Sequence, residues 1–261
     1  MKRTLLEKIP LELPQEIARL IEGGQIYDSS CSPEARVYFI DRDGGYYLKT
    51  ALGGSLEKES QMTAYFHSLG LGTEVLHYSK GERDLLLTER MRGEDCTYGA
   101  YLDDPRRLCD TIAEQLRRLH EITPIGCPVP DRTAEYIATV EENYRTGNYD
   151  KSQFPDSFGY RGTEDAIRVF DEGRHLLKSD TLLHGDYCLP NIMLDDWTFS
   201  GFIDLGNGGV GDRHVDLFWG AWTLSFNLHT DAYRDRFLDA YGRDRVDEEL
   251  LRTVAAAEVF G

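Results

Sequence analysis

The sequence lacks the cysteine patterns and long apolar runs that mark several protein classes. Its five cysteines are scattered over 261 residues with no CxxC pair, which argues against a disulfide framework and for reduced thiols. No apolar run approaches the roughly 20 residues needed to cross a bilayer. Near its start the chain carries Glu7, Glu12 and Glu16, which signal and transit peptides avoid. We therefore expect a cytoplasmic protein with no membrane partner.

Positive charge is also scarce. There are 29 Lys and Arg against 46 Asp and Glu, a formal net charge of -17. Such an excess repels nucleic acid and anionic lipid but attracts a cationic ligand. Hydrophobic residues make up 41% and charged residues 29% of the chain, close to globular averages. The chain is long enough for one large domain or two modest lobes, and we expect a monomer or weak dimer.

The first 90 residues carry the pattern of a small sheet with one helix. Residues 34–50 alternate polar and apolar side chains around Asp43-Gly44-Gly45, which predicts a hairpin whose second strand ends at Lys49. Residues 55–69 have helical spacing, with Ser55 as a possible cap and Gly70 as the stop. A second hairpin is predicted over 74–89.

The rest of the chain is mostly helical in pattern. Helices are predicted over 104–122, 131–146 and 164–178, and two more follow Asp231. One short β stretch, at 182–205, interrupts them. The sequence therefore predicts an α+β protein with a β-rich part at 1–90 and a mainly helical part at 91–261.

Polar side chains gather around the β stretch. Residues 191–194 and 199–205 form two apolar runs joined by the turn "DDWT", which predicts a hairpin. Asp186 and Asn191 precede its first strand and Asp204 ends its second, so the fold of the hairpin can bring all three to one site. Two carboxylates and an amide oxygen suit a hard cation such as Mg²⁺ held with a nucleotide.

Other chemistries fit this stretch less well. Zinc would require a second ligand pair beside His184 and Cys188, and a serine hydrolase would require a GxSxG turn, which is absent. Gly206 to Gly211 matches GxGxxG, but only about 50 residues with a mainly helical pattern follow, too few for a dinucleotide-binding domain. We expect a flexible loop there. No GxxxxGK[ST] is present.

The run "HGDYCLPNI", followed by "SGFIDLG" and "GDRHVDL", resembles the aminoglycoside phosphotransferase family, and is most similar to its 3'-phosphotransferases that act on kanamycin-like antibiotics. The resemblance implies a two-lobed protein-kinase-like fold. A small β-rich nucleotide-binding lobe would span 1–90, and a larger, mainly helical lobe with the catalytic hairpin and the substrate site would span 91–261. ATP and Mg²⁺ are the implied cofactors.

The same resemblance implies a role for individual residues. Asp186 would position or deprotonate the substrate hydroxyl, whereas Asn191 and Asp204 would hold Mg²⁺ on the ATP phosphates. His184 would be structural. Lys49 would contact the phosphates and Glu59 would be its ion-pair partner. Further implied nucleotide contacts are Tyr47 against the adenine, Ser32 in the glycine-free phosphate-covering segment, and backbone groups of Glu89 and Met91 at the hinge.

The substrate is implied less directly. Glu258 and Phe260 match part of an acidic C-terminal pattern that binds the polycationic drug, and the net charge agrees. Four positions depart from the pattern: Asn207 stands where an Arg is usual, Phe226 and Asn227 where acids are usual, and Ala257 where an Asp is usual. The leading hypothesis is a resistance kinase for the 3'-hydroxyl of a kanamycin-type aminoglycoside. The alternatives are a kinase for choline, a macrolide or a sugar, and a pseudokinase, against which the intact site residues argue.

Overall fold

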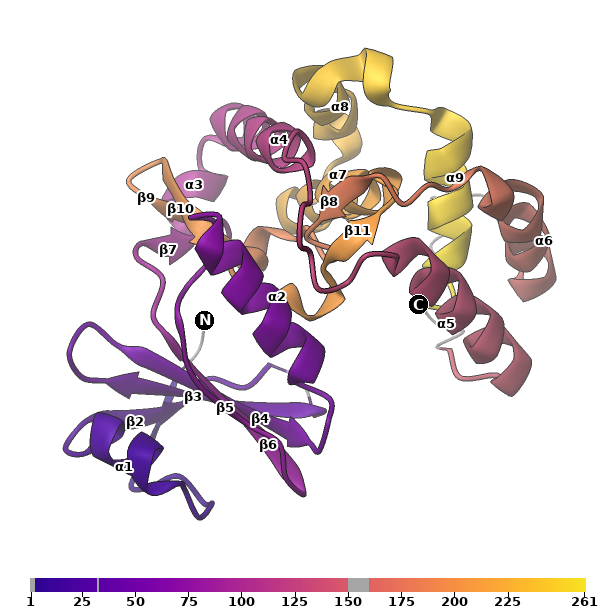
Figure 1. Cartoon of the computed structure of the whole chain (residues 1–261). Helices are drawn as coiled ribbons and strands as arrows, with labels where there is room; N and C mark the ends of the chain where they lie inside the picture. The colour runs from indigo at the N-terminus through magenta and orange to yellow at the C-terminus, as the bar shows by residue number, and fades with distance from the viewer. Residues whose placement is uncertain (1–2, 32, 150–159) are drawn as a thin grey trace. The chain divides into compact units, whose positions relative to one another are not determined.

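The computed structural model describes residues 3–31, 33–149 and 160–261. It divides into two compact units (Figure 1). The first unit is Met1–Gly93 with Met193–Gly206, and the second is Glu94–Ile192 with Asn207–Gly261. The division predicted from the sequence assigns residues 193–206 to the second part, whereas the contacts group them with the first unit. In the described residues, no helix combines the length and the apolar character needed to cross a membrane.

The first unit is built on a six-stranded antiparallel sheet in the order β1-β2-β3-β4-β6-β5. The two predicted hairpins are β3-β4 and β5-β6. The sequence patterns did not reveal β1, β2 or the helix α1 (Gln15–Ile21). The strands are β1 (Thr4–Leu6), β2 (Gln25–Asp28), β3 (Ala35–Asp41), β4 (Tyr46–Leu52), β5 (Val75–Ser79) and β6 (Arg83–Glu89).

The two faces of this sheet have different cores. Leu48 of β4 packs with Ile17 and Ile21 of α1, while Ala51, on the other face, packs with Leu56. Because side chains alternate along a strand, Lys49 shares the face of Ala51. That is the face on which α2 (Glu57–Ser68) follows Leu56.

The helix α2 begins differently from the prediction. Ser55 does not cap it, because its hydroxyl donates to the Leu52 carbonyl instead, at 2.6 Å. The buried carboxylate of Asp84 accepts hydrogen bonds from the backbone amides of Gly54, at 2.9 Å, and Leu56, at 3.0 Å. A side chain from β6 therefore fixes the turn that precedes α2.

The predicted hairpin near the site is present as β9 (Ile192–Asp195) and β10 (Thr198–Phe202). Its turn contains Asp196 and Trp197 with φ of 46° and 66°, the positive values of a tight two-residue hairpin turn. The Phe202 amide donates to the Leu71 carbonyl at 2.8 Å. Its ring packs edge-to-face on Phe66 of α2, at 6.1 Å between centroids. These contacts join the hairpin to the first unit.

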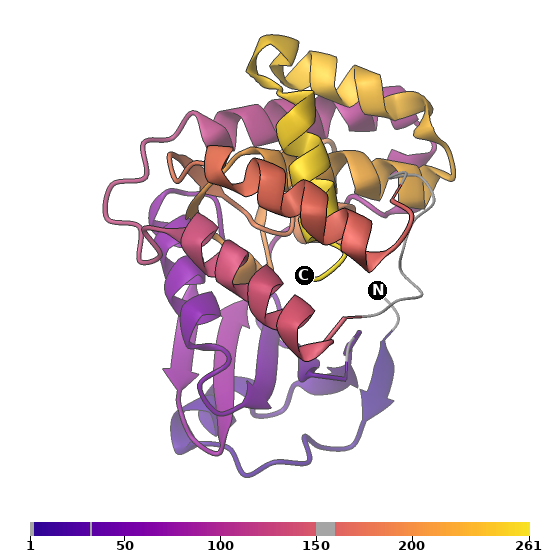
Figure 2. The same cartoon turned by 90° about the vertical axis from the view of Figure 1, so that its right-hand side faces the viewer.

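The second unit is mainly helical. Within it α9 packs against α6, and α4 against α8 (Figures 1 and 2). Its helices are α3 (Gly99–Leu102), α4 (Pro105–His120), α5 (Arg132–Thr146), α6 (Thr163–Gly173), α7 (His214–Leu228), α8 (Arg234–Gly242) and α9 (Glu248–Ala257). Its strands are β7 (Glu94–Asp95), β8 (Thr181–Leu183) and β11 (Gly209–Gly211).

The helices α4 and α5 follow their sequence patterns closely. Asp104 caps α4 by accepting from the Arg107 amide at 3.3 Å, and Asp131 caps α5 by accepting from the Ala134 amide at 3.1 Å. The apolar stripe of α4 is fully buried, as its spacing predicts; its members are Leu108, Ile112, Leu116 and Leu119.

The expectation of a flexible loop at 206–211 is wrong. Gly209–Gly211 forms β11, which pairs antiparallel with β8 and is buried. Its glycines serve close packing, because a Cβ on Gly211 would lie 2.6 Å from the Leu183 side chain and one on Gly209 would lie 2.8 Å from Val129. The glycine-rich pattern thus marks a strand that lies tightly against its neighbours.

Candidate active site

The first unit holds a charged cluster made by three elements. The Lys49 ammonium, on β4, lies 2.8 Å from Glu59 Oε2 of α2 and 2.8 Å from Asp204 Oδ1, just after β10. The Lys49 and Glu59 side chains are largely enclosed, whereas that of Asp204 is 51% exposed. Asp204 has a left-handed backbone, with φ of 59°. The predicted Lys49–Glu59 pair is therefore formed, and Asp204 joins it.

The electrostatics of this cluster keep its lysine charged. Burial disfavours the Lys49 ammonium, but the carboxylates of Glu59 and Asp204 outweigh this and raise its pKa to about 12. Burial raises the pKa of Glu59, and the lysine opposes that shift. A fixed cation and an exposed carboxylate thus lie side by side, which suits the phosphates of a metal-bound nucleotide.

In the second unit, a fully buried carboxylate holds the segment that follows β8. Asp216 of α7 accepts hydrogen bonds from the backbone amides of His184, at 2.8 Å, and Gly185, at 2.7 Å. Gly185 has φ of 83°, and a Cβ there would lie 1.9 Å from the Asn207 carbonyl oxygen. Only glycine fits this position, and the two hydrogen bonds to Asp216 fix the backbone before Asp186.

A histidine side chain supplies a further hydrogen bond to the Asp216 carboxylate. His120 Nε2 lies 3.1 Å from Asp216 Oδ2, and His120 Nδ1 lies 2.9 Å from the Tyr241 hydroxyl. Burial lowers the pKa of His120 despite the carboxylate beside it, so the ring is neutral. Because a carboxylate can only accept, Nε2 carries the proton and Nδ1 accepts from Tyr241.

The predicted catalytic residue, Asp186, and the predicted magnesium ligand Asn191 contact each other within the same segment. Asn191 Nδ2 donates to the Asp186 carbonyl at 3.0 Å and to Asp186 Oδ2 at 2.9 Å. The Asp186 amide donates to His184 Nδ1 at 3.2 Å, and the His184 side chain is fully buried. Asn191 therefore orients the Asp186 carboxylate, while His184 supports the backbone.

The chemistry of the donors fits the predicted magnesium ligands. Since Asn191 Nδ2 is committed to Asp186, its Oδ1 is left without a hydrogen bond among the residues described and can act as an oxygen ligand. The exposed carboxylate of Asp204 is the other oxygen donor. The two residues belong to different units, so a shared ion remains a prediction.

The other predicted nucleotide contacts have varied surroundings. The Tyr47 hydroxyl accepts from Arg3 at 2.9 Å, and its ring packs on Phe39 at 5.2 Å between centroids. The Glu89 amide already donates to the Glu74 carbonyl, at 3.1 Å. Met91 makes no backbone hydrogen bond within the described part of the chain, so it is the better candidate for the base edge. Ser32 lies outside the described residues.

The two predicted substrate residues differ in their surroundings. Glu258 Oε1 accepts from the Tyr136 hydroxyl at 2.7 Å. Burial raises the pKa of Glu258 to about 7, an effect that Asp186 strengthens and that Tyr136 and Arg132 oppose. Phe260 is only 1% exposed, and its ring packs on Tyr144. Glu258 therefore has a titratable carboxylate beside Asp186, whereas the Phe260 side chain belongs to the core.

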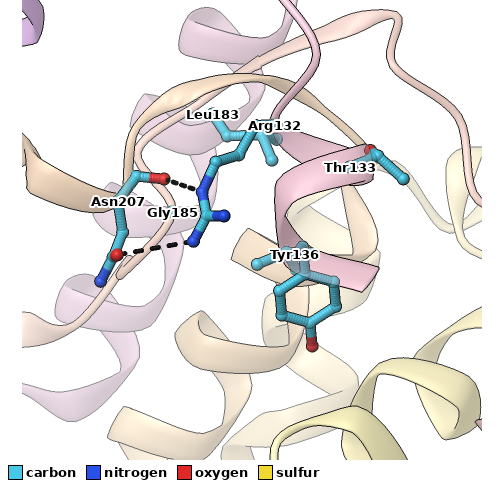
Figure 3. A pocket seen from close by; sticks show the side chains of 7 residues that line it. Arg132, Thr133, Tyr136, Leu183, Gly185 and Asn207 are labelled. Atoms are coloured by element: carbon cyan, nitrogen blue, oxygen red, sulfur yellow. Dashed lines mark hydrogen bonds between the residues drawn. The ribbon is translucent and has the colours of Figure 1, made fainter. Parts of the chain in front are cut away.

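A small pocket lies beside the segment from His184 to Asn191, which carries the predicted catalytic residue and is called the catalytic segment (Figure 3). Arg132 Nε, on α5, donates to the Asn207 carbonyl at 3.0 Å, and its Nη2 lies 3.5 Å from Asn207 Oδ1. Asn207 is the position where the resemblance expects an arginine. A guanidinium is thus present here, supplied by α5. The pocket is lined by Arg132, Thr133, Tyr136, Leu183, Gly185, Asn207 and Val215.

Cys188, in the same segment, is by residue type a candidate nucleophile or zinc ligand. Burial raises the pKa of the Cys188 thiol far above its ordinary value, so Cys188 is protonated and a poor nucleophile or ligand. All five cysteines are free. Across the described residues, no group of three or more His, Cys, Asp and Glu side chains is placed so that it could hold a metal ion.

The two sets of residues match the residue types that protein kinases use for phosphoryl transfer. A strand lysine paired with a helix glutamate holds nucleotide phosphates, and a loop aspartate followed by an asparagine serves the acceptor and the metal. The sequence patterns and the family resemblance located these residues but gave no role to Asp216, His120 or Tyr241. The one available signal was an acidic residue inside the apolar run of α7.

Comparison with known proteins gives the family. Residues 32–252 match the phosphotransferase enzyme family, so the chain belongs to this family and is a phosphotransferase with an alcohol acceptor. It is 50% identical over 251 residues to a probable aminoglycoside 3'-phosphotransferase of Lactococcus lactis subsp. lactis (strain IL1403), covering 96% of this chain and 95% of the relative. It is 28% identical over 180 residues to an aminoglycoside 3'-phosphotransferase of Niallia circulans, covering 69% and 68%.

Solved structures show the same fold. A type VIII aminoglycoside 3'-phosphotransferase superposes with a TM-score of 0.79 at 22% identity, over 94% of this chain and 98% of that one. A Streptomyces rimosus aminoglycoside phosphotransferase in complex with ADP and streptomycin gives 0.69 at 24% identity, over 87% and 91%. The predicted kinase-like α+β fold is confirmed.

Proposed function

We propose that this protein transfers the γ-phosphoryl group of ATP to the 3'-hydroxyl of a kanamycin-type aminoglycoside and so confers resistance to the drug. The observation that carries the proposal is the Asp186 carboxylate held by Asn191 in a chain that is 50% identical to a probable aminoglycoside 3'-phosphotransferase. The net charge of -17 favours a polycationic substrate. We further propose a cytoplasmic monomer or weak dimer.

On the acceptor side, Asp186 would accept the hydroxyl proton as the phosphoryl group leaves the nucleotide. Its orientation rests on the two hydrogen bonds from Asn191 and on the backbone fixed by Asp216. Glu258 would bind an ammonium group of the drug, and its pKa of about 7 makes the carboxylate available at neutral pH. Phosphoryl transfer depends mainly on such positioning of the reacting groups.

On the nucleotide side, Lys49 would bind the phosphates while Glu59 holds the lysine in place. Tyr47 and the backbone of Met91 are proposed contacts of the base. Asn191 and Asp204 would hold Mg²⁺, which when bound neutralises phosphate charge.

The proposal is tested by measuring ADP release from ATP and Mg²⁺ with kanamycin, neomycin, choline and a macrolide. We expect turnover with kanamycin and neomycin, and none with a 3'-deoxy analogue of kanamycin, which lacks only the accepting hydroxyl. Asp186→Asn should abolish turnover and still bind ATP by calorimetry. Turnover of choline or the macrolide but no aminoglycoside would replace the proposed substrate. ATP binding without turnover of any compound would indicate a pseudokinase.

A further inference from the structure

The helix α7 presents three aromatic side chains along one face. Trp219, Trp222 and Phe226 are spaced three and four residues apart, so they share a face of the helix. The rings of Trp219 and Trp222 meet edge-on at 5.3 Å between centroids, and those of Trp222 and Phe226 stack at 4.9 Å with 13° between planes. Phe226 is 62% exposed, and both tryptophans are partly exposed. We call these three residues the aromatic stripe.

One end of the aromatic stripe lies at the acceptor residues. The Trp219 and Asp186 side chains both lie close enough to Glu258 to affect its pKa, which Trp219 lowers and Asp186 raises. On the neighbouring face of α7, the Thr223 hydroxyl accepts from the Leu189 amide at 3.1 Å, within the catalytic segment. One helix therefore anchors the catalytic segment and extends the stripe outward from Glu258.

The chemistry of the aromatic stripe suits a cation. The π faces of tryptophan and phenylalanine attract ammonium groups within about 6 Å. Within the described residues no Arg or Lys side chain stacks on these three rings. Asn227, the polar neighbour of Phe226, turns back to the helix, because its amide donates to the Thr223 carbonyl at 2.8 Å and to the Thr223 hydroxyl at 3.1 Å.

We propose that the aromatic stripe and Glu258 together form a subsite for an ammonium-bearing ring of the acceptor. Glu258 makes the ion pair at one end, and the exposed Phe226, stacked on Trp222, binds a further ammonium group through the π face that Trp222 leaves open. This inference rests on the proposed function. It implies that the specificity for amino sugars, beyond Glu258, comes from the aromatic rings of α7.

The test replaces the aromatic faces while keeping apolar bulk. Phe226→Leu and Trp222→Leu each remove a π face, and Phe226→Tyr and Trp222→Phe retain it. We expect the leucine variants to raise the KM for kanamycin roughly tenfold, with little change in kcat or in the KM for ATP. The aromatic variants should stay within about twofold of the parent. Because Phe226 is exposed, Phe226→Leu should fold normally, as circular dichroism would verify.

A binding measurement separates the subsite from turnover. Trp197→Phe leaves Trp219 and Trp222 as the remaining tryptophans of the three in the chain. In this background, kanamycin added without nucleotide should change the tryptophan fluorescence, and an uncharged disaccharide at the same concentration should not. Adding Phe226→Leu should weaken the kanamycin titration by the same factor as the change in KM.

The outcomes distinguish the inference from the proposed function. If the parent enzyme phosphorylates kanamycin and both leucine variants keep its KM, the subsite is refuted and the proposed function stands. If the parent enzyme phosphorylates no aminoglycoside, both are refuted. If the leucine variants convert a dimeric parent to a monomer in sedimentation experiments without raising KM, the stripe is a contact between two copies of the chain and the subsite is refuted.

Discussion

Asp204 and Asp216 are close in sequence but have opposite surroundings. Asp204 is half-exposed, has a left-handed backbone and contacts the charged Lys49. Asp216 is fully buried, and its partners are two backbone amides and a neutral histidine. An aspartate near solvent beside a cation can exchange partners when a ligand arrives. A buried aspartate with every partner supplied by the protein fixes backbone geometry.

This comparison separates residues that should change activity from residues that should change stability. Removing Asp204 costs few contacts in the folded chain, because it is exposed. Removing the charge of Asp216 leaves buried donors without an acceptor, which is expensive in free energy. The following variants test that separation.

The largest expected effect is on turnover. Asp204→Ala should lower kcat by roughly 10³-fold, because a proposed ligand of the Mg²⁺ that neutralises the phosphate charge is lost. The melting temperature should stay nearly unchanged. Steady-state ADP release and thermal denaturation measure the two effects. Asp195→Ala, an exposed acid in the same hairpin, is the matched control and should keep full activity. A large drop in the melting temperature of Asp204→Ala would contradict the assignment.

The next effect is on stability. Asp216→Asn should lower the free energy of unfolding by about 3–5 kcal/mol, since the amide cannot accept from all three donors and introduces a donor of its own. Urea denaturation followed by circular dichroism measures this loss. Asp239→Asn, on the exposed surface of α8, is the control and should change stability by less than about 1 kcal/mol. Equal stabilities of the two variants would refute the anchoring role of Asp216.

A smaller loss is expected one step farther from the carboxylate. Tyr241→Phe removes the hydroxyl that donates to His120 Nδ1 and should cost about 1 kcal/mol. The same denaturation experiment applies. His120→Phe also leaves Asp216 without one donor, so it should cost more than Tyr241→Phe. A larger loss of stability in Tyr241→Phe than in His120→Phe would contradict the role of His120 as the link between Tyr241 and Asp216.

The smallest effect is on the pH dependence of substrate binding. With a pKa of about 7, Glu258 is neutral below that pH and charged above it, so the KM for kanamycin should fall a few-fold as the pH rises from 6 to 8. Glu258→Gln should remove this component and leave only the titration of the drug itself. Tyr136→Phe should move the midpoint upward, because the Tyr136 hydroxyl favours the charged form. Identical profiles in all three proteins would exclude Glu258 as the titrating group.

Local patterns were sufficient for much of the fold and of the site. The hairpins around Gly44-Gly45 and around Asp196-Trp197 were predicted because their turns have distinctive residues. The pairing of Lys49 with Glu59 followed from the family resemblance, since a strand lysine or a helix glutamate alone has no unique meaning. Asp204 was located by its place at the end of the hairpin around Asp196-Trp197.

Other features depend on contacts between distant parts of the chain. The helix α7 was not predicted, because its sequence is apolar on nearly every side and has no periodic polar face. The strand β11 was taken for a loop because glycines usually mark turns, whereas here they permit close contact with Leu183. The role of Asp216 depends on His120, which is 96 residues away, and no local pattern reports such a pair.

The placement of residues 193–206 in the first unit has a consequence for synthesis on the ribosome. Lys49 and Asp204 are 155 residues apart in the chain, and translation adds about 5–20 residues each second. Asp204, the second carboxylate that contacts Lys49, is therefore synthesised about 8–30 s after the lysine. During that interval the nascent first unit has Glu59 as its partner for the lysine, but the cluster of Lys49, Glu59 and Asp204 is complete only after most of the second unit has been made.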